Sequence, residues 1–176
     1  MMMQANNARG NAEAESVRLR QEVYRSDVEK MAEWMEDEEV VRYLNEEQDI
    51  EDRLHQTLRQ TNLPIFSPQL SRNGSFFLVT LPESGPIGFL RLIPKEEGTE
   101  IVIVIGERSQ WGKSYGYQAV KKGVRVAFFR WREEKVIAKI HEENERSKHL
   151  FRKAGFSREG QMNGQEKFTV TLDEYN

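Results

Sequence analysis

The fold is decided by the stretch Ile103-Val-Ile-Gly-Glu-Arg-Ser-Gln-Trp-Gly-Lys-Ser-Tyr-Gly116. It closes the β-branched run Glu100–Ile105 and leads into an amphipathic pattern over 114–130, which predicts a buried strand, a turn and a helix. The first amides of a helix carry partial positive charge, and Gly112 and Gly116 place no Cβ in the path of an anion. The stretch therefore indicates either an anion-binding turn or an ordinary strand-to-helix connection.

Hydrophobic periodicity predicts further elements on both sides of this segment. Strands are expected over Ser16–Leu19, Phe76–Leu81, Ile87–Ile93, Lys135–Ile140, Ser157–Met162 and Glu166–Leu172, and helices after a cap at Ser26, over Ile50–Gln60 and over Asn144–Ala154. A loop is expected over Asn62–Ser75, and Asn163-Gly164 is a strong hairpin signal. The order of elements predicts a mixed α/β sheet in one domain.

Length and composition limit the classes of protein that this chain can be. Its 176 residues are enough for one α/β domain with one sizeable core. We expect residues 1–15 to form a disordered tail and residues 16–176 to form the domain. No apolar run approaches the length that crosses a bilayer, so we expect no membrane contact.

The net charge, the lack of cysteine and the spacing of the histidines argue against further classes of protein. A net charge of −3 argues against a nucleic-acid binder that neutralises phosphates. The chain has no cysteine, which suits a cytoplasmic location, and its histidines, His55, His141 and His149, lack metal-ligand spacing. The segment 27–52 holds twelve acidic residues and two basic ones. That segment is either a solvated helical face or a surface that attracts a cationic substrate.

A nucleotide P-loop is one interpretation of the turn. Gly106 and the run Gly112-Lys113-Ser114 nearly match the P-loop pattern, but five residues separate the glycines where the pattern has four. One inserted residue re-aims the amides that wrap the phosphates. Trp111 is bulky beside the glycine, and Glu107 brings negative charge near the phosphates, so this interpretation is disfavoured.

The second interpretation is a family resemblance. The run Ile105–Ala119 resembles the acetyl-CoA loop of the GNAT N-acetyltransferases, most closely the branch of ribosomal-protein N-terminal and spermidine-type acetyltransferases. The run Ala138–Phe156 resembles that family's second motif, in the same order and at the same separation. Including the upstream strands, the resemblance covers residues 16–173. It implies a single-domain fold with a mixed, mostly antiparallel central sheet flanked by helices.

The resemblance implies where acetyl-CoA binds. Backbone groups around Val104, Ile105 and Gly106 would pair with the pantetheine arm and polarise the thioester carbonyl. Asn144 would contact the same arm, although asparagine is also a preferred helix N-cap. Amides of the turn would bind the diphosphate, and these belong to Trp111, Gly112, Lys113, Ser114, Tyr115 and Gly116. Ser114 departs from the family, which usually has glycine at this position.

The resemblance also implies catalytic roles. Glu100 would accept the proton of the amine, commonly through water, and Ser147 would face the sulfur. Many members carry a tyrosine as general acid where this chain has Phe151, which cannot give a proton. The acid would then be Ser147 or water, or the thiolate would leave unprotonated, because thiols have a pKa of about 8.5.

These observations lead to one principal hypothesis and one alternative. We expect an N-acetyltransferase that passes an acetyl group from acetyl-CoA to a primary amine, either a small amine or polyamine or a protein N-terminus. The resemblance further implies a homodimer through the C-terminal strands, and no metal is expected. The alternative is a non-catalytic acetyl-CoA sensor or interaction module, which Phe151 and Ser114 support.

Overall fold

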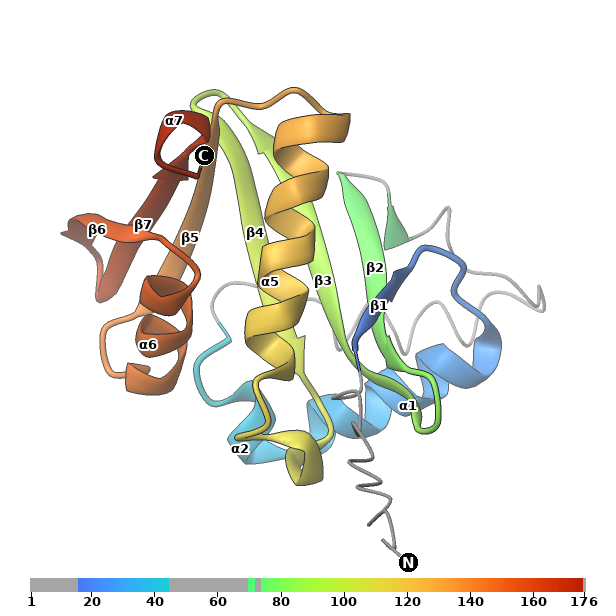
Figure 1. Ribbon diagram of the computed structural model, residues 1–176. Coiled ribbons are helices and arrows are strands. Elements are labelled where there is room, and N and C mark those ends of the chain that lie inside the picture. Colours follow the sequence, from blue (N-terminus) through green and yellow to red (C-terminus); the bar gives the residue numbers. More distant parts are fainter. Residues whose placement is uncertain (1–15, 45–69, 72–73, 176) are drawn as a thin grey trace, which may run out of the picture.

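The computed structural model describes residues 16–44, 70–71 and 74–175. The predicted helix over Ile50–Gln60, the predicted tail 1–15 and most of the predicted loop Asn62–Ser75 lie outside them. Along the chain the elements are β1 Arg18–Arg20, α1 Arg25–Glu36, α2 Glu38–Val41, β2 Ser75–Leu81, β3 Gly85–Lys95, β4 Gly98–Ile105, η2 Arg108–Gln110, α5 Tyr115–Arg125, η3 Val126–Arg130, β5 Lys135–His141, α6 Glu145–Lys153, β6 Ser157–Met162, β7 Gln165–Thr171 and α7 Leu172–Tyr175 (Figure 1).

The strands form one seven-stranded sheet in the order β1-β2-β3-β4-β5-β7-β6. Every neighbouring pair is antiparallel except β4 and β5, which run parallel. A parallel pair needs a crossover, and α5 with η3 supplies it. The prediction of a mixed, mostly antiparallel sheet flanked by helices is therefore confirmed.

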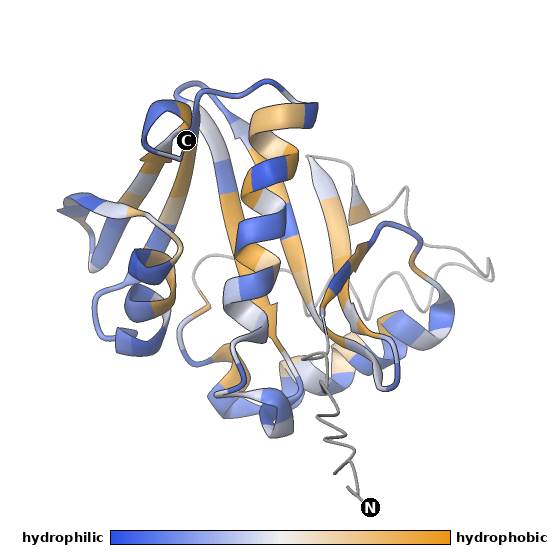
Figure 2. Cartoon of the chain, in the orientation of Figure 1, coloured by the Kyte–Doolittle hydropathy of each residue, from blue (hydrophilic) through white to orange (hydrophobic). Residues whose placement is uncertain are grey.

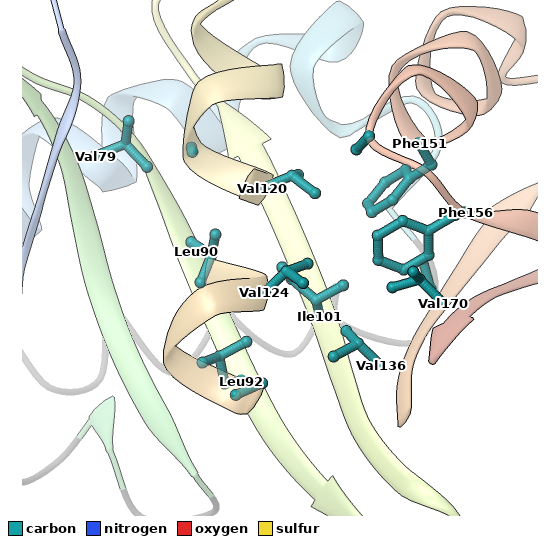
Figure 3. Close-up of a cluster of buried hydrophobic side chains, with 14 of the residues drawn as sticks. Val79, Leu90, Leu92, Ile101, Val120, Val124, Val136, Phe151, Phe156 and Val170 are labelled. Carbon is teal, nitrogen blue, oxygen red and sulfur yellow. The ribbon is translucent and has the colours of Figure 1, made fainter. Parts of the chain in front are cut away.

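Two apolar clusters cover the two faces of the sheet. On one face α5 and α6 lie over the central strands, and Val120 and Val124 of α5 pack beside Leu90 and Ile101 (Figures 1 and 3). The strands beneath α5 are largely hydrophobic, whereas the turns of α5 alternate between polar and apolar residues (Figure 2). On the other face α1 packs against β2, β3 and Val104. Cover on both sides explains the nearly unbroken β-branched run of β4.

The predicted cap of the first helix is wrong by two residues. The helix begins at Arg25, so Tyr24 is the N-cap and Ser26 lies inside the first turn. The reason is Asp27, whose carboxylate accepts the N–H of Tyr24 at 2.8 Å and pairs with Arg20 at 3.0 Å. This ionised acceptor satisfies the helix start more strongly than a serine hydroxyl does. The predicted apolar face is confirmed, since Val28, Met31, Ala32 and Met35 are buried.

The hairpin β6–β7 forms the end of the sheet next to β5. Asn163 and Gly164 take φ values of 56° and 77°, which confirms the predicted tight turn. A cluster of opposite charges ties the strands together: Glu159 pairs with Lys135 at 3.0 Å and with Lys167 at 3.3 Å. The hydrogen bond from Lys135 is the main reason that the pKa of Glu159 falls to about 2.

Within the described residues, no helix combines the length and apolar character that crossing a membrane requires.

Candidate active site

The strands β4 and β5 are paired only near their beginnings and then diverge. Thr99 lies opposite Val136 and Glu100 opposite Ile137, and these two described strands share no later pair. Figure 1 shows the strands separating toward the end where α6 lies. The divergence opens a cleft of about 440 Å³, lined by β4, β5, residues 110–112 and 114–117, α6 and residues of the 39–44 segment. The cleft thus brings together both motifs that the sequence singled out.

Alternation along β4 decides which of its backbone groups face the cleft. In an antiparallel ladder, the N–H and C=O of every second residue point to the same edge. Gly106 donates to Ile87 O of β3 at 2.8 Å, so Val104, two residues earlier, also points its backbone groups at β3. The backbone groups of Ile103 and Ile105 consequently point toward β5 and the cleft. Ile103, which was not predicted from the sequence, therefore presents its backbone groups to the cleft, whereas Val104 lines the cleft but points its backbone groups at β3.

A β-bulge ends β4. The amides of Gly106 and Glu107 both donate to Ile87 O, at 2.8 and 3.1 Å, so these two residues lie opposite the single residue Ile87 of β3. A Cβ on Gly106 would lie 2.2 Å from the Trp34 ring, and the indole N–H of Trp34 donates to Glu107 at 2.8 Å. Gly106 therefore fixes the end of the strand against α1, and its own amide is already paired.

The turn after the bulge presents helix amides to the cleft. Gly112 and Ser114 adopt positive φ values of 76° and 65°, and α5 begins at the next residue. Gln118 N–H donates to Ser114 O at 3.0 Å, which makes it the first bonded amide of the helix. The amides of residues 115–117 precede it, and all three residues line the cleft. This arrangement fits the anion-binding turn that is one of the two expectations from the sequence.

The backbone at Ser114 is left-handed, which fits the glycine that the family resemblance implies at this position. A residue with a Cβ pays about 1 kcal/mol for this conformation. We expect Ser114→Gly to raise the free energy of unfolding by about 0.5 kcal/mol, because glycine's greater freedom in the unfolded chain offsets part of the gain. Urea denaturation measures the change. A loss of stability would mean that the serine side chain itself stabilises the turn.

Lys113 does not line the cleft. Its ammonium donates to Gln110 Oε1 at 3.3 Å in an exposed position. Gly116 does line the cleft and is buried, and a Cβ there would meet Leu150 Cδ1 at 2.7 Å. Glycine at this position thus lets the start of α5 approach α6 closely.

Trp111 connects the two walls of the cleft. Its indole N–H donates to Ile105 O at 2.8 Å, which anchors the ring to the end of β4. The guanidinium carbon of Arg146, in the first turn of α6, lies 3.6 Å from the ring centroid. Desolvation lowers the pKa of Arg146, while Glu39 and Tyr43 raise it. Arg146 was not predicted from the sequence, because no local pattern shows that Trp111 and α6 meet.

Asn144 and Ser147 lie together at the start of α6. Asn144 is the N-cap, and its side-chain oxygen accepts Ser147 N–H at 3.2 Å. Both residues line the cleft. The cap uses the amide oxygen of Asn144, so its NH₂ group remains available as a donor. The two roles considered for Asn144 are therefore compatible.

Glu100 reaches the cleft from the α1 face of the sheet. Its side chain is 14% exposed and lies between two ammonium groups, Lys95 at 3.6 Å and Lys139 at 3.7 Å. Ser147 belongs to a helix on the opposite face. The two candidate catalytic residues therefore approach the gap between β4 and β5 from opposite sides.

Phe151 is a core residue that also borders the cleft. Its side chain is 3% exposed and packs edge-on against Phe156, with ring centroids 5.0 Å apart. Other proton-bearing side chains line the cleft, including Tyr43 and His141, whose rings lie 5.2 Å apart. His141 Nδ1 accepts the N–H of Glu143, so the proton of a neutral ring sits on Nε2.

The described residues contain no group of three or more His, Cys, Asp or Glu side chains placed to hold a metal ion. The cleft combines an amide-rich turn with an open strand edge between diverging parallel strands, an arrangement that suits an extended anionic ligand.

Comparison with known proteins identifies the class. The model of the acetyltransferase (GNAT) domain family matches residues 17–157, so the chain belongs to the GNAT acetyltransferase family. A search of curated protein sequences found no match. The specific ribosomal-protein branch that the sequence suggested is not distinguished by these comparisons.

Solved structures share the fold at low sequence identity. A domain from Methanocaldococcus jannaschii is 19% identical with a TM-score of 0.69, and the match covers 90% of this chain and 99% of that one. Spermidine N-acetyltransferase from Vibrio cholerae, in complex with CoA and spermine, is 17% identical with a TM-score of 0.67 and coverages of 91% and 98%. AAC(6')-Ib in complex with ribostamycin and coenzyme A is 20% identical with a TM-score of 0.72 and coverages of 91% and 96%.

Proposed function

We propose that this protein is an acetyl-CoA-dependent N-acetyltransferase that acts on a primary amine. The observation that carries the proposal is the meeting, in one cleft, of the helix amides of residues 115–117 with the open β4 edge at Ile103 and Ile105. The amides suit a diphosphate. The open strand edge suits a ligand with amide groups, because these can form hydrogen bonds with the backbone of β4.

The backbone of β4 supports binding of the pantetheine arm. The N–H and C=O of Ile103 and the N–H of Ile105 face a gap where β5 has moved away, and β4 has no strand partner there within the described residues. Polar backbone groups away from water require partners, and the amides of pantetheine provide them. Asn144 adds a side-chain donor from the facing wall. The residues present therefore fit acetyl-CoA.

Acetyl-CoA supplies a thioester whose carbonyl carbon accepts the amine. The amine nitrogen forms a bond to that carbon, the carbon–sulfur bond breaks, and the electron pair leaves with sulfur. Glu100, directly or through water, takes the proton that the amine loses. The N–H of Ile105 is the donor proposed to stabilise the carbonyl oxygen. Ser147 or water supplies the proton to sulfur, or sulfur leaves as thiolate.

The acidic segment 27–52 is described as far as residue 44, and most of its acidic side chains there form ion pairs with neighbouring basic residues. Asp27 is bonded to Arg20, and Asp37 lies 3.6 Å from Arg108. Glu39 is the only acidic residue of the described part of 27–44 that lines the cleft. A solvated helical face is therefore the better interpretation there. A primary amine, small or at a protein N-terminus, remains the proposed acceptor class, and the complexes with spermine and ribostamycin support an amine.

A thiol-release assay tests the function. The protein, acetyl-CoA and one amine at a time, chosen among polyamines, aminoglycosides, lysine and peptides, are expected to release free CoA with at least one class. A rise in melting temperature with acetyl-CoA measures binding separately. Binding without thiol release from any amine would favour the sensor alternative. No binding at millimolar acetyl-CoA would overturn both the enzyme and the sensor hypotheses.

The role of Glu100 leads to a graded prediction. Glu100→Gln is expected to lower kcat/KM about 100-fold for an alkyl amine, because that amine, with a pKa of about 10.4, needs a proton acceptor. For a peptide α-amine, with a pKa near 7.8, the loss should be about tenfold or less. The matched control is Glu96→Gln, an exposed residue in the neighbouring turn. Equal losses for both amines would remove Glu100 from proton transfer.

A further inference from the structure

We propose that Arg146 is a charged ligand of the acetyl-CoA diphosphate and that Trp111 holds it in place. The inference rests on the proposed function and adds a residue that neither motif assigns. It identifies which cation of this chain meets the phosphates. The family resemblance implies only the backbone amide of Lys113 at the diphosphate, and the Lys113 ammonium is bonded to Gln110 outside the lining of the cleft.

The position of Arg146 is fixed by two successive contacts. Trp111 directly precedes Gly112 of the turn, and its indole N–H is bonded to Ile105 O at 2.8 Å. The guanidinium of Arg146 lies on the face of that anchored ring, 3.6 Å from its centroid. A cation at this distance from an indole is attracted to the ring and loses part of its freedom. Arg146 is therefore held beside the turn whose amides face the cleft.

The stacked guanidinium keeps its donors available. Stacking uses the flat face of the group, whereas its five N–H donors point outward in the plane. Among the described residues, no carboxylate lies within ion-pair distance of Arg146, whereas Lys95 and Lys139 both pair with Glu100. Arginine in this state suits bidentate bonding to phosphate oxygens. Lys153 also lines the cleft, but its ammonium lies over the Tyr117 ring at 4.6 Å and lacks the planar fork of donors that a guanidinium has. Arg146 is thus a cleft cation with both the charge and the forked donors that a diphosphate uses.

Ligand truncation separates a diphosphate contact from a purely structural role of Arg146. Three probes are used: acetyl-CoA, its 3′-dephospho form, which keeps the diphosphate, and S-acetylpantetheine, which lacks it. We expect Arg146→Ala to lower kcat/KM about tenfold or more for the first two, by the same factor, and less than twofold for the third. Trp111→Leu, which removes the ring, should show the same ranking. Arg152→Ala is the matched control, since Arg152 is an exposed arginine of α6 that lies over the Phe168 ring and outside the cleft lining, and it should leave all three within twofold.

Several outcomes would overturn the proposal. Equal losses for all three probes would mean that Arg146 only supports the fold or the acceptor site. A loss for acetyl-CoA alone would place Arg146 at the 3′-phosphate. No loss for any probe would leave Arg146 as a surface residue. If the unaltered protein turns over none of the probes, the proposed function fails instead, so the two failures are distinguishable. Thermal unfolding without ligand checks that each variant is folded.

Discussion

Replacing Gly88 with alanine is expected to lower the free energy of unfolding by about 3 kcal/mol and to weaken acetyl-CoA binding at least tenfold. Gly88 lies on β3 opposite Ile105, and a Cβ there would come 2.1 Å from the Val104 carbonyl oxygen and 2.9 Å from the Ile105 Cα. Backbone atoms cannot rotate away as a side chain does. The end of β4 must therefore shift, and that end carries the strand edge offered to the cofactor.

The chain supplies a matched control for this substitution. Gly160 in β6 is also a strand glycine, but a Cβ there would meet nothing within 4 Å. Gly160→Ala should change the free energy of unfolding by less than about 1 kcal/mol. Urea denaturation compares the two variants, and calorimetry with acetyl-CoA measures the affinity. Similar effects from the two substitutions would show that β3 and β4 are not locked together at Gly88.

Phe151→Ala is expected to lower the free energy of unfolding by about 4 kcal/mol, which is more than the loss expected for Gly88→Ala. Phe151 is 3% exposed and belongs to the cluster that Figure 3 draws, beside Phe156 and Val170. The surrounding strands and α6 cannot close the space that the ring leaves. The family resemblance implies a general-acid tyrosine at this position in many members, whereas Phe151 packs in the core of this chain.

Two further variants test whether the loss comes from packing. Phe151→Leu keeps most of the buried volume and should cost about 1 kcal/mol. Phe129→Ala removes a ring that is 54% exposed and should cost less than about 1 kcal/mol. Chemical denaturation gives all three free energies of unfolding, provided that their dependence on denaturant concentration has the same slope in each variant. A loss near 1 kcal/mol for Phe151→Ala would mean that the cluster repacks around the missing ring.

Local chemistry made most of the fold predictable. The structure confirms the apolar runs of β2, β3 and β4, the Asn163-Gly164 turn and the Asn144 cap, each of which depends on residues close together in the chain. The misplaced cap at Ser26 shows the limit of such reasoning. Arg20, outside the helix, supports Asp27 through an ion pair that a local pattern does not contain.

For the candidate site too, some features could be predicted from the sequence and others required the tertiary structure. The sequence by itself determined that a strand, a glycine-bearing turn and a helix start would form, because backbone conformation and periodicity are local properties. Tertiary structure alone decided that β4 and β5 separate after Glu100, that the backbone groups of Ile103 rather than those of Val104 point to the gap, and that Arg146 lies on the Trp111 ring. These relations join residues far apart in the chain, and only the packing of helices on both faces of the sheet brings them within contact distance.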